Sequence, residues 1–272
     1  MRFTVRHLTR YRYDRPVRLS PHLLRLTPRD ASARDVAWSL TVSPTPLARI
    51  EETDRWGNAV IRLEFGDATD ALVIDSRFTL DTVAPPLPAI ALPPLPWRPE
   101  PDFAPWLDEP LADAAVADFA AALAGEADGD PARFVDLLTE RLYTRTDRHI
   151  RPDGNAHTPA ETLASRRGAC RDLTVLFMAV CRGLGMPARF VSGYQARAET
   201  PDGQRHLHAW PEVHLPGVGW RGYDPTHGRR VTDAHAALCH APDQAGTMPL
   251  EGGYYGAPVA SRLDYSVEIQ AD

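Results

Sequence analysis

The sequence contains no lysine, so all 30 of its basic residues are arginine. Enzymes that form a Schiff base, use a lysine nucleophile or attach pyridoxal phosphate covalently are therefore excluded. Cysteine is also scarce, since the chain has only Cys170, Cys181 and Cys239. Three cysteines without regular spacing do not fit a disulfide framework, and neither a CxxC nor an HExxH zinc motif occurs.

Long apolar runs are missing as well. No stretch approaches the ~18 residues that a membrane-spanning helix needs, and residues 1–16 lack the apolar centre of a secretory signal. The formal net charge is −6, whereas nucleic-acid-binding proteins usually carry a basic surface. We expect a soluble, cytoplasmic protein with neither a nucleic-acid nor a membrane partner.

Residues 1–83 are typical of an all-β domain. Turn residues separate four segments rich in valine, isoleucine, phenylalanine and threonine: FTVRHLTRYRY, VAWSLTVSP, NAVIRLEF and ALVIDSRFTLDTV. These segments predict a small antiparallel β-sandwich. Residues 84–106 contain nine prolines, which predicts a linker, or a strap packed along the surface, at the domain boundary.

Residues 107–272 place helices before strands. One helix is predicted to end at Gly125, a second to begin with Asp130 as N-cap and Pro131 as its first residue, and a third to begin near Cys170. Strands are predicted at 188–196, 205–215, 219–226 and 261–270. Helices followed by an antiparallel meander indicate an α+β domain.

Cys170 lies at the N-terminus of the third predicted helix, within the stretch RGACRD. Unpaired backbone N–H groups at a helix N-terminus stabilise a thiolate. Helical spacing places Cys170 on the same stripe as Leu173 and Phe177, so the thiol points toward whatever packs there. Taken alone, a buried packing cysteine is the simpler interpretation, and it is the one that suits Cys181 and Cys239. Asp172 is expected to cap the helix or to supply negative charge at its N-terminus.

His208 and Asp224 lie on two strands joined by a tight turn rich in glycine, and they can be cross-strand neighbours. A cysteine at a helix mouth, a histidine on one strand and an aspartate on the next are the components of an activated thiol. His208 would take the thiol proton and Asp224 would orient the imidazole. The Cys170 N–H would serve as the oxyanion donor.

Three blocks, RGACRDLTVLFMAVCRGLGMPARFVSGYQ, HLHAWPEV and GWRGYDPTHG, resemble the catalytic blocks of the bacterial transglutaminase-like superfamily. The RLTPR and DRWGN motifs in the first third resemble the β-domain that precedes the core in bacterial members. The resemblance implies a papain-like fold with Cys170, His208 and Asp224 as a triad. It also implies acyl transfer on a peptide or protein amide, without a cofactor or metal.

The chain departs from this pattern at two positions. Pro211 removes a backbone donor beside the proposed base, which predicts that its strand lies at a sheet edge. His227 adds a second imidazole near Asp224. Further candidates for the oxyanion site or the substrate cleft are Gln195, Tyr194, Tyr143 and Trp210.

We therefore expect an all-β sandwich at residues 1–83, a proline-rich linker or strap at 84–106 and a transglutaminase-like α+β catalytic domain at 107–272. The favoured activity is that of a cysteine peptidase or amidase, and glutamine–amine crosslinking is the alternative acyl transfer. Two other classes remain open. One is a non-catalytic scaffold. The other is a metal-dependent hydrolase that uses the His206/His208 pair with Cys170, His214 or His240.

Overall fold

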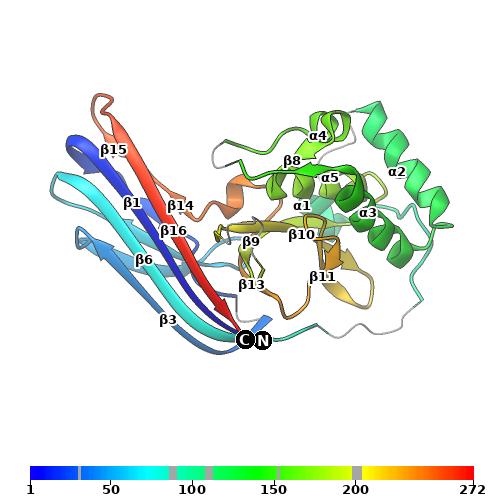
Figure 1. The fold of residues 1–272 in the computed structure, drawn as a ribbon, viewed down its shortest axis with the longest axis horizontal. Helices are drawn as coiled ribbons and strands as arrows, with labels where there is room; N and C mark the ends of the chain where they lie inside the picture. The colour runs from blue at the N-terminus through cyan, green and yellow to red at the C-terminus, as the bar shows by residue number, and fades with distance from the viewer. Residues whose placement is uncertain (30–31, 86–90, 108–112, 152–153, 198–203) are drawn as a thin grey trace.

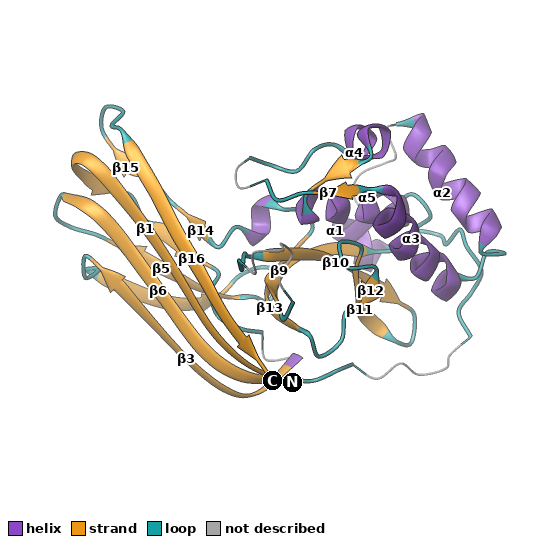
Figure 2. Cartoon of the chain, viewed as in Figure 1, coloured by secondary structure: helices purple, strands orange, loops and turns teal. Residues whose placement is uncertain are grey.

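The computed structural model describes residues 1–29, 32–85, 91–107, 113–151, 154–197 and 204–272. A β-sandwich lies beside a unit in which helices cover a five-stranded sheet (Figures 1 and 2). Among the helices of the described residues, none is long and apolar enough to cross a membrane.

Two antiparallel sheets form the sandwich. The first contains long strands that pair in the order β15-β1-β6-β3, with β16 also pairing with β1: β1 (Arg2–Leu19), β3 (Ala33–Ser43), β6 (Thr69–Thr82), β15 (Tyr254–Tyr255) and β16 (Ser261–Ala271). The second has the order β14-β2-β5-β4: β2 (His22–Leu24), β4 (Ala48–Thr53), β5 (Ala59–Glu64) and β14 (Leu250–Glu251). Alternate residues of β6, such as Leu72, Ile74 and Phe78, are buried in the sandwich core, as strand periodicity requires.

The C-terminal strand belongs to the sandwich and not, as expected, to the catalytic domain at 107–272. β16 pairs with β1 in register from Phe3–Ala271 to Tyr13–Ser261, and both chain termini lie together at one end of this sheet (Figure 1). The sequence pattern of residues 261–270 predicts a strand but contains no information about its distant partner. The sandwich is therefore built from both ends of the chain.

The proline-rich segment is a strap on the helical unit. Within its described part, the N–H of Trp97 donates to the carbonyl of Leu184 at 2.8 Å, and the N–H of Leu95 donates to Gly129 at 2.9 Å. Gly185 has φ +77°, and an added Cβ there would lie 2.2 Å from the Trp97 carbonyl oxygen. Leu87 and Ile90 lie in residues 86–90, outside the described part. The strap ends in η2 (Pro101–Phe103) and α1 (Ala104–Leu107).

The helical unit packs helices against a sheet with the order β12-β11-β10-β9-β13. Its helices are α2 (Ala114–Glu126), α3 (Pro131–Arg145), α4 (Pro159–Ser165) and α5 (Cys170–Arg182), with the short η3 (Ala245–Thr247). Its strands are β9 (Ala188–Gln195), β10 (His208–Leu215), β11 (Gly219–Asp224), β12 (Arg229–Arg230) and β13 (His235–Ala241), beside the two-residue pair β7 (Asp147–Arg148) and β8 (Arg167–Gly168).

Short-range sequence patterns predicted several of these helices and strands correctly. The Asp130 side chain accepts a hydrogen bond from the N–H of Arg133 at 2.9 Å, so the predicted cap of α3 is confirmed. β10 as a whole lies between β9 and β11, but at Pro211 it is paired on one side only, in agreement with an edge at that position. Pro211 pairs with Phe190 of β9, and the ladder with β11 begins only at Glu212. Proline has no backbone N–H to donate, and Pro211 therefore lies just before the first residue of the β10–β11 ladder.

The sandwich and the helical unit share a buried interface. Tyr194, Ala236 and Leu238 of the five-stranded sheet in the helical unit are buried in the core of the sandwich. Glu212 of β10 accepts hydrogen bonds from Arg189 at 2.7 Å and from Arg29 at 3.2 Å. Burial would raise the pKa of Glu212, but Arg29 and Arg189 outweigh it and lower that pKa to about 2.

We predict that Glu212→Gln lowers the free energy of unfolding at pH 7 by about 3 kcal/mol, because it leaves two arginines without their carboxylate. A depressed carboxylate pKa stabilises the fold above the unfolded-state pKa of about 4.3, and this contribution disappears as pH falls from there toward 2. Urea unfolding at several pH values should show the two proteins converging in acid. Glu52→Gln, which breaks the exposed pair with Arg62, should cost less than about 1 kcal/mol. Equal losses in both variants would contradict this interpretation.

Candidate active site

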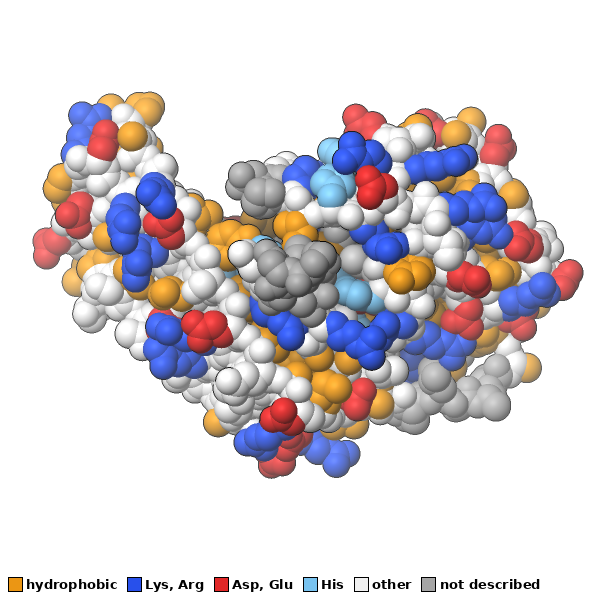
Figure 3. All heavy atoms as spheres, in the orientation of Figure 1, with side chains coloured by type: hydrophobic (Ala, Val, Ile, Leu, Met, Phe, Trp, Pro, Cys, Tyr) orange, Lys and Arg blue, Asp and Glu red, His pale blue; other side chains and the backbone are white. Residues whose placement is uncertain are grey.

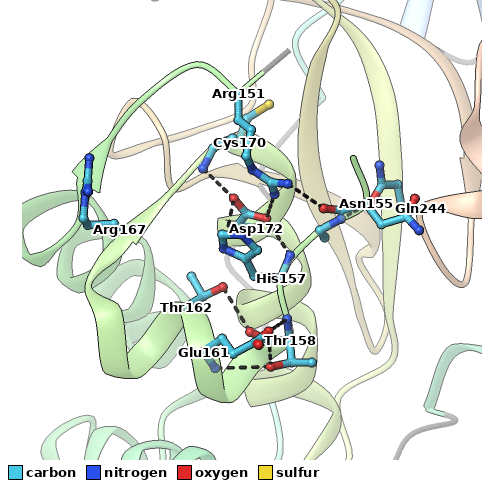
Figure 4. A network of polar contacts seen from close by, with 12 residues as sticks. Arg151, Asn155, His157, Thr158, Glu161, Thr162, Arg167, Cys170, Asp172 and Gln244 are labelled. Carbon is cyan, nitrogen blue, oxygen red and sulfur yellow. Dashed lines mark hydrogen bonds and ion pairs between the residues drawn. The ribbon is translucent and has the colours of Figure 1, made fainter. Parts of the chain in front are cut away.

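Cys170 is the first residue of α5, and its side chain is half-buried. The capping predicted for Asp172 is confirmed, because its Oδ2 accepts a hydrogen bond from the N–H of Ala169 at 2.7 Å. The same fully buried carboxylate accepts from Arg151 at 2.6 Å and from the N–H of His157 at 2.7 Å through Oδ1 (Figure 4). One carboxylate thus fixes the start of the helix and joins it to the preceding loop.

His208 and Asp224 meet across neighbouring strands, as predicted. His208 is the first residue of β10 and Asp224 is the last of β11, and Glu212 pairs with Gly222 between those ends. His208 Nε2 lies 3.0 Å from Asp224 Oδ2, and both side chains are buried. Strand register therefore brings together two residues that are 16 positions apart in the chain.

Asp224 Oδ2 is the meeting point of three imidazoles. Besides His208, His227 Nδ1 lies 2.8 Å away and His235 Nε2 lies 2.9 Å away. Asp224 Oδ1 accepts hydrogen bonds from the N–H groups of Thr226 at 3.0 Å and His227 at 3.2 Å. The imidazole expected at position 227 is present, whereas His235 was missed because β13 shows only a short apolar run with no motif around it.

Electrostatics keep this carboxylate ionised. Burial would raise the pKa of Asp224, but the interactions with His208, His227 and His235 hold it well below its usual value. Burial lowers the pKa of His235, although Asp224 opposes that effect. A neutral His235 donates its Nε2 proton to Asp224, while its buried Nδ1 has no hydrogen-bond partner among the described residues.

Cys170 and His208 line the same cavity, which has a volume of about 350 Å³. The surface is hollowed between the sandwich and the helical unit (Figure 3). Strands β1 and β16 of the sandwich contribute five of the lining residues: His7, Thr9, Tyr11, Leu263 and Tyr265. Within the described part of the chain, no aspartate or glutamate lines this cavity.

The four additional candidates from the sequence lie outside the lining described for this cavity. The Tyr194 hydroxyl pairs with His7 Nδ1 at 2.7 Å inside the sandwich core, and Gln195 Oε1 accepts from the N–H of Arg197 at 2.6 Å. Tyr143 is exposed on α3 beneath the Arg148 guanidinium. Trp210 is buried behind His208, with ring centroids 5.9 Å apart, and also packs on His235.

The predicted alternative metal set does not assemble around Cys170. His206 pairs with the Tyr265 hydroxyl at 3.1 Å, His214 packs on Phe103 and His240 packs on Trp106. A different group, His208, Asp224 and His227, presents nitrogen and oxygen atoms within 4.8 Å of one another. These residue types suit a metal ion, although their nitrogens already lie within hydrogen-bond distance of the carboxylate.

Comparisons with known proteins agree with this architecture. Residues 3–81 match the bacterial transglutaminase-like N-terminal region, and residues 118–225 match the transglutaminase-like superfamily. An uncharacterized protein of Mycobacterium tuberculosis is 30% identical over 295 residues, which cover 98% of this chain and 92% of that protein. A Mycobacterium leprae protein, also uncharacterized, is 26% identical over 278 residues, or 98% of each chain.

Two further known proteins support more limited conclusions about this chain. A solved structure of a candidate cysteine protease from Cytophaga hutchinsonii has a TM-score of 0.72 at 20% identity, covering 99% of this chain and 90% of that one. This similarity establishes a shared fold. A Pseudomonas aeruginosa protein-glutamine gamma-glutamyltransferase is 38% identical over 69 residues, which are 23% of this chain and 10% of that protein. The predicted family is confirmed, and the chain belongs to the transglutaminase-like superfamily.

Proposed function

We propose that this protein is a thiol-dependent acyl-transfer enzyme that cleaves amide bonds, with Cys170 as nucleophile, His208 as general base and acid, and Asp224 as the group that orients His208. The observation that carries this proposal is that Cys170 and His208 face one cavity while Asp224 holds the imidazole from behind. The helix N-terminus at Cys170 provides the partial positive charge that favours a thiolate.

Asp224 selects the tautomer of the base. Because Nε2 of His208 donates to the carboxylate, Nδ1 is the nitrogen that accepts the thiol proton. The Cys170 sulfur then attacks the substrate carbonyl carbon, and the carbonyl oxygen becomes an oxyanion that the Cys170 N–H can bind. The imidazolium returns its proton to the leaving nitrogen as the C–N bond breaks, which leaves a thioester on Cys170.

Transfer of the acyl group from Cys170 to water or to an amine completes the cycle. Water loses a proton to His208, attacks the thioester carbonyl and releases a carboxylic acid and the free thiol. An amine acceptor would instead form a new amide. We favour water, because a lysine ammonium entering this cavity finds no carboxylate among the described lining residues.

We predict that iodoacetamide alkylates Cys170 at least about 10²-fold faster than Cys181 or Cys239 at neutral pH. Burial raises the pKa of both comparison thiols, that of Cys239 to about 12. Peptide mass spectrometry measures the three rates separately, and His208→Ala should slow the labelling of Cys170 by about tenfold or more while leaving the rates of the two buried thiols unchanged. Equally slow labelling of all three thiols would favour a non-catalytic scaffold.

We predict that Asp224→Asn lowers amidase kcat by roughly 10⁴-fold, because the amide no longer enforces the His208 tautomer. Circular dichroism and a thermal melt should show that the variant remains folded, since Asn keeps the shape and one acceptor oxygen. Asp243→Asn changes an exposed aspartate whose side chain accepts a hydrogen bond from the N–H of Gly246 in η3, and it should retain near wild-type kcat. A wild-type rate in Asp224→Asn would remove Asp224 from the mechanism.

A metal-dependent hydrolase is the competing function, and the His208, Asp224 and His227 group is the observation that favours it. Metal analysis of the purified protein separates the two. We expect activity to persist after chelation and to be lost on alkylation. One tightly bound zinc per chain whose removal abolishes activity would contradict the thiol mechanism.

A further inference from the structure

We propose that the sandwich strands β1 and β16 form one wall of the substrate site, and that this wall selects an apolar, preferably aromatic, side chain in the acyl part of the substrate. This inference rests on the proposed function, because it takes Cys170 as the reacting atom. It gives the N-terminal and C-terminal strands a role in specificity.

Two large apolar side chains are exposed where β16 borders the cavity. Leu263 is 46% exposed and Tyr265 is 43% exposed, and both line the cavity. In the β1–β16 ladder, Leu263 pairs with Tyr11 and Tyr265 pairs with Thr9. Because paired residues on one face of a sheet lie side by side, these four form a continuous patch.

Other residues that line the cavity are also apolar. Ile150, Leu207, Met248, Pro249 and Leu250 belong to the lining together with Cys170 and His208, and Leu250 is part of β14 in the second sheet of the sandwich. A side chain bound among these residues and the β1–β16 patch would bury much of its apolar surface. Such burial is the main favourable contribution to binding of a ring or branched aliphatic group.

The sandwich wall is held in place relative to the catalytic strand. His206 Nδ1 lies 3.1 Å from the Tyr265 hydroxyl, and Arg205 forms an antiparallel bridge with Val267. These contacts lie two and three residues before His208. The distance between the β16 patch and the catalytic base is therefore constrained by the backbone.

Charge restricts the substrate further. Arg151 and Arg171 line the cavity, and no acidic residue does so within the described part of the chain. Arg151 is paired with Asp172, which lies behind the lining. A cationic substrate side chain would lose its hydration here without gaining a carboxylate partner. We therefore expect the site to discriminate against lysine-like and arginine-like groups.

The test compares three alkylating probes on the full chain: iodoacetamide, N-(2-phenylethyl)iodoacetamide and N-(2-aminoethyl)iodoacetamide. In each case the Cys170 sulfur–carbon bond forms and iodide leaves, so the probes differ only in the group that enters the cavity. Rates on Cys170 are measured by peptide mass spectrometry and divided by each probe's rate on glutathione. We expect the phenylethyl probe to exceed the aminoethyl probe by roughly tenfold or more.

Variants assign this preference to the sandwich wall. Leu263→Asp should reduce the phenylethyl-to-iodoacetamide rate ratio by about fivefold to tenfold. Ser266→Asp places the same charge on the same exposed strand but on its other face, and it should leave the ratio unchanged. A ratio unaffected by Leu263→Asp, or reduced equally by Ser266→Asp, would overturn the inference.

The outcomes also separate this inference from the proposed function. Slow labelling of Cys170 by iodoacetamide itself would count against a catalytic thiol, whatever the ratio between probes. Fast labelling by iodoacetamide without a preference for the phenylethyl group would leave the catalytic thiol in place and reject the apolar wall.

Discussion

The helical unit is organised around the buried carboxylate of Asp224. Its two oxygens accept from three imidazoles and two backbone N–H groups, which come from β10, the turn after β11, and β13. A buried charge is costly unless such partners surround it. The need to satisfy this carboxylate therefore ties three separate segments together at the point where His208 must be held.

This arrangement divides the work between the two ends of the His208 ring. The Nε2 end of the ring is buried against Asp224, and the ring packs on Trp210, which also packs on His235, while His208 also lines the cavity with Cys170. Asp172 performs a comparable task for the thiol, because it fixes the helix start that carries Cys170. Two buried aspartates thus position Cys170 and His208 independently, which is the preorganisation that the proposed acyl transfer needs.

The sandwich and the helical unit act as one structure around the cavity. Arg29 of the RLTPR motif reaches Glu212 on β10, and its N–H donates to the carbonyl of Ala237 of β13. These contacts fix the relative placement of β1 and β16, which line the cavity opposite the α5 side. The motif that resembles the bacterial β-domain therefore has a physical role in joining that domain to the core.

Part of the fold and of the site could be predicted from short-range sequence patterns. The caps of α3 and α5, and the approach of His208 to Asp224, follow from short-range patterns: an Asp-Pro helix start, an apolar stripe and a tight turn between two strands. Contacts between residues that are far apart in the sequence were not predictable. β16 pairs with β1 across almost the entire chain, His235 reaches Asp224 from a strand without a motif, and Pro211 occupies a central strand because one ladder ends beside it. Each of these depends on register, which sequence periodicity leaves undetermined.

The most direct test of the thiol mechanism is to trap the acyl-enzyme. The full chain is mixed with 4-nitrophenyl phenylacetate, quenched in acid within the first turnover and examined by intact-mass and peptide mass spectrometry. The mechanism predicts one phenylacetyl group per chain, located on Cys170, released by hydroxylamine and absent from Cys170→Ala. Rapid release of 4-nitrophenol without an acyl group on Cys170, or with the acyl group on another residue, would contradict it.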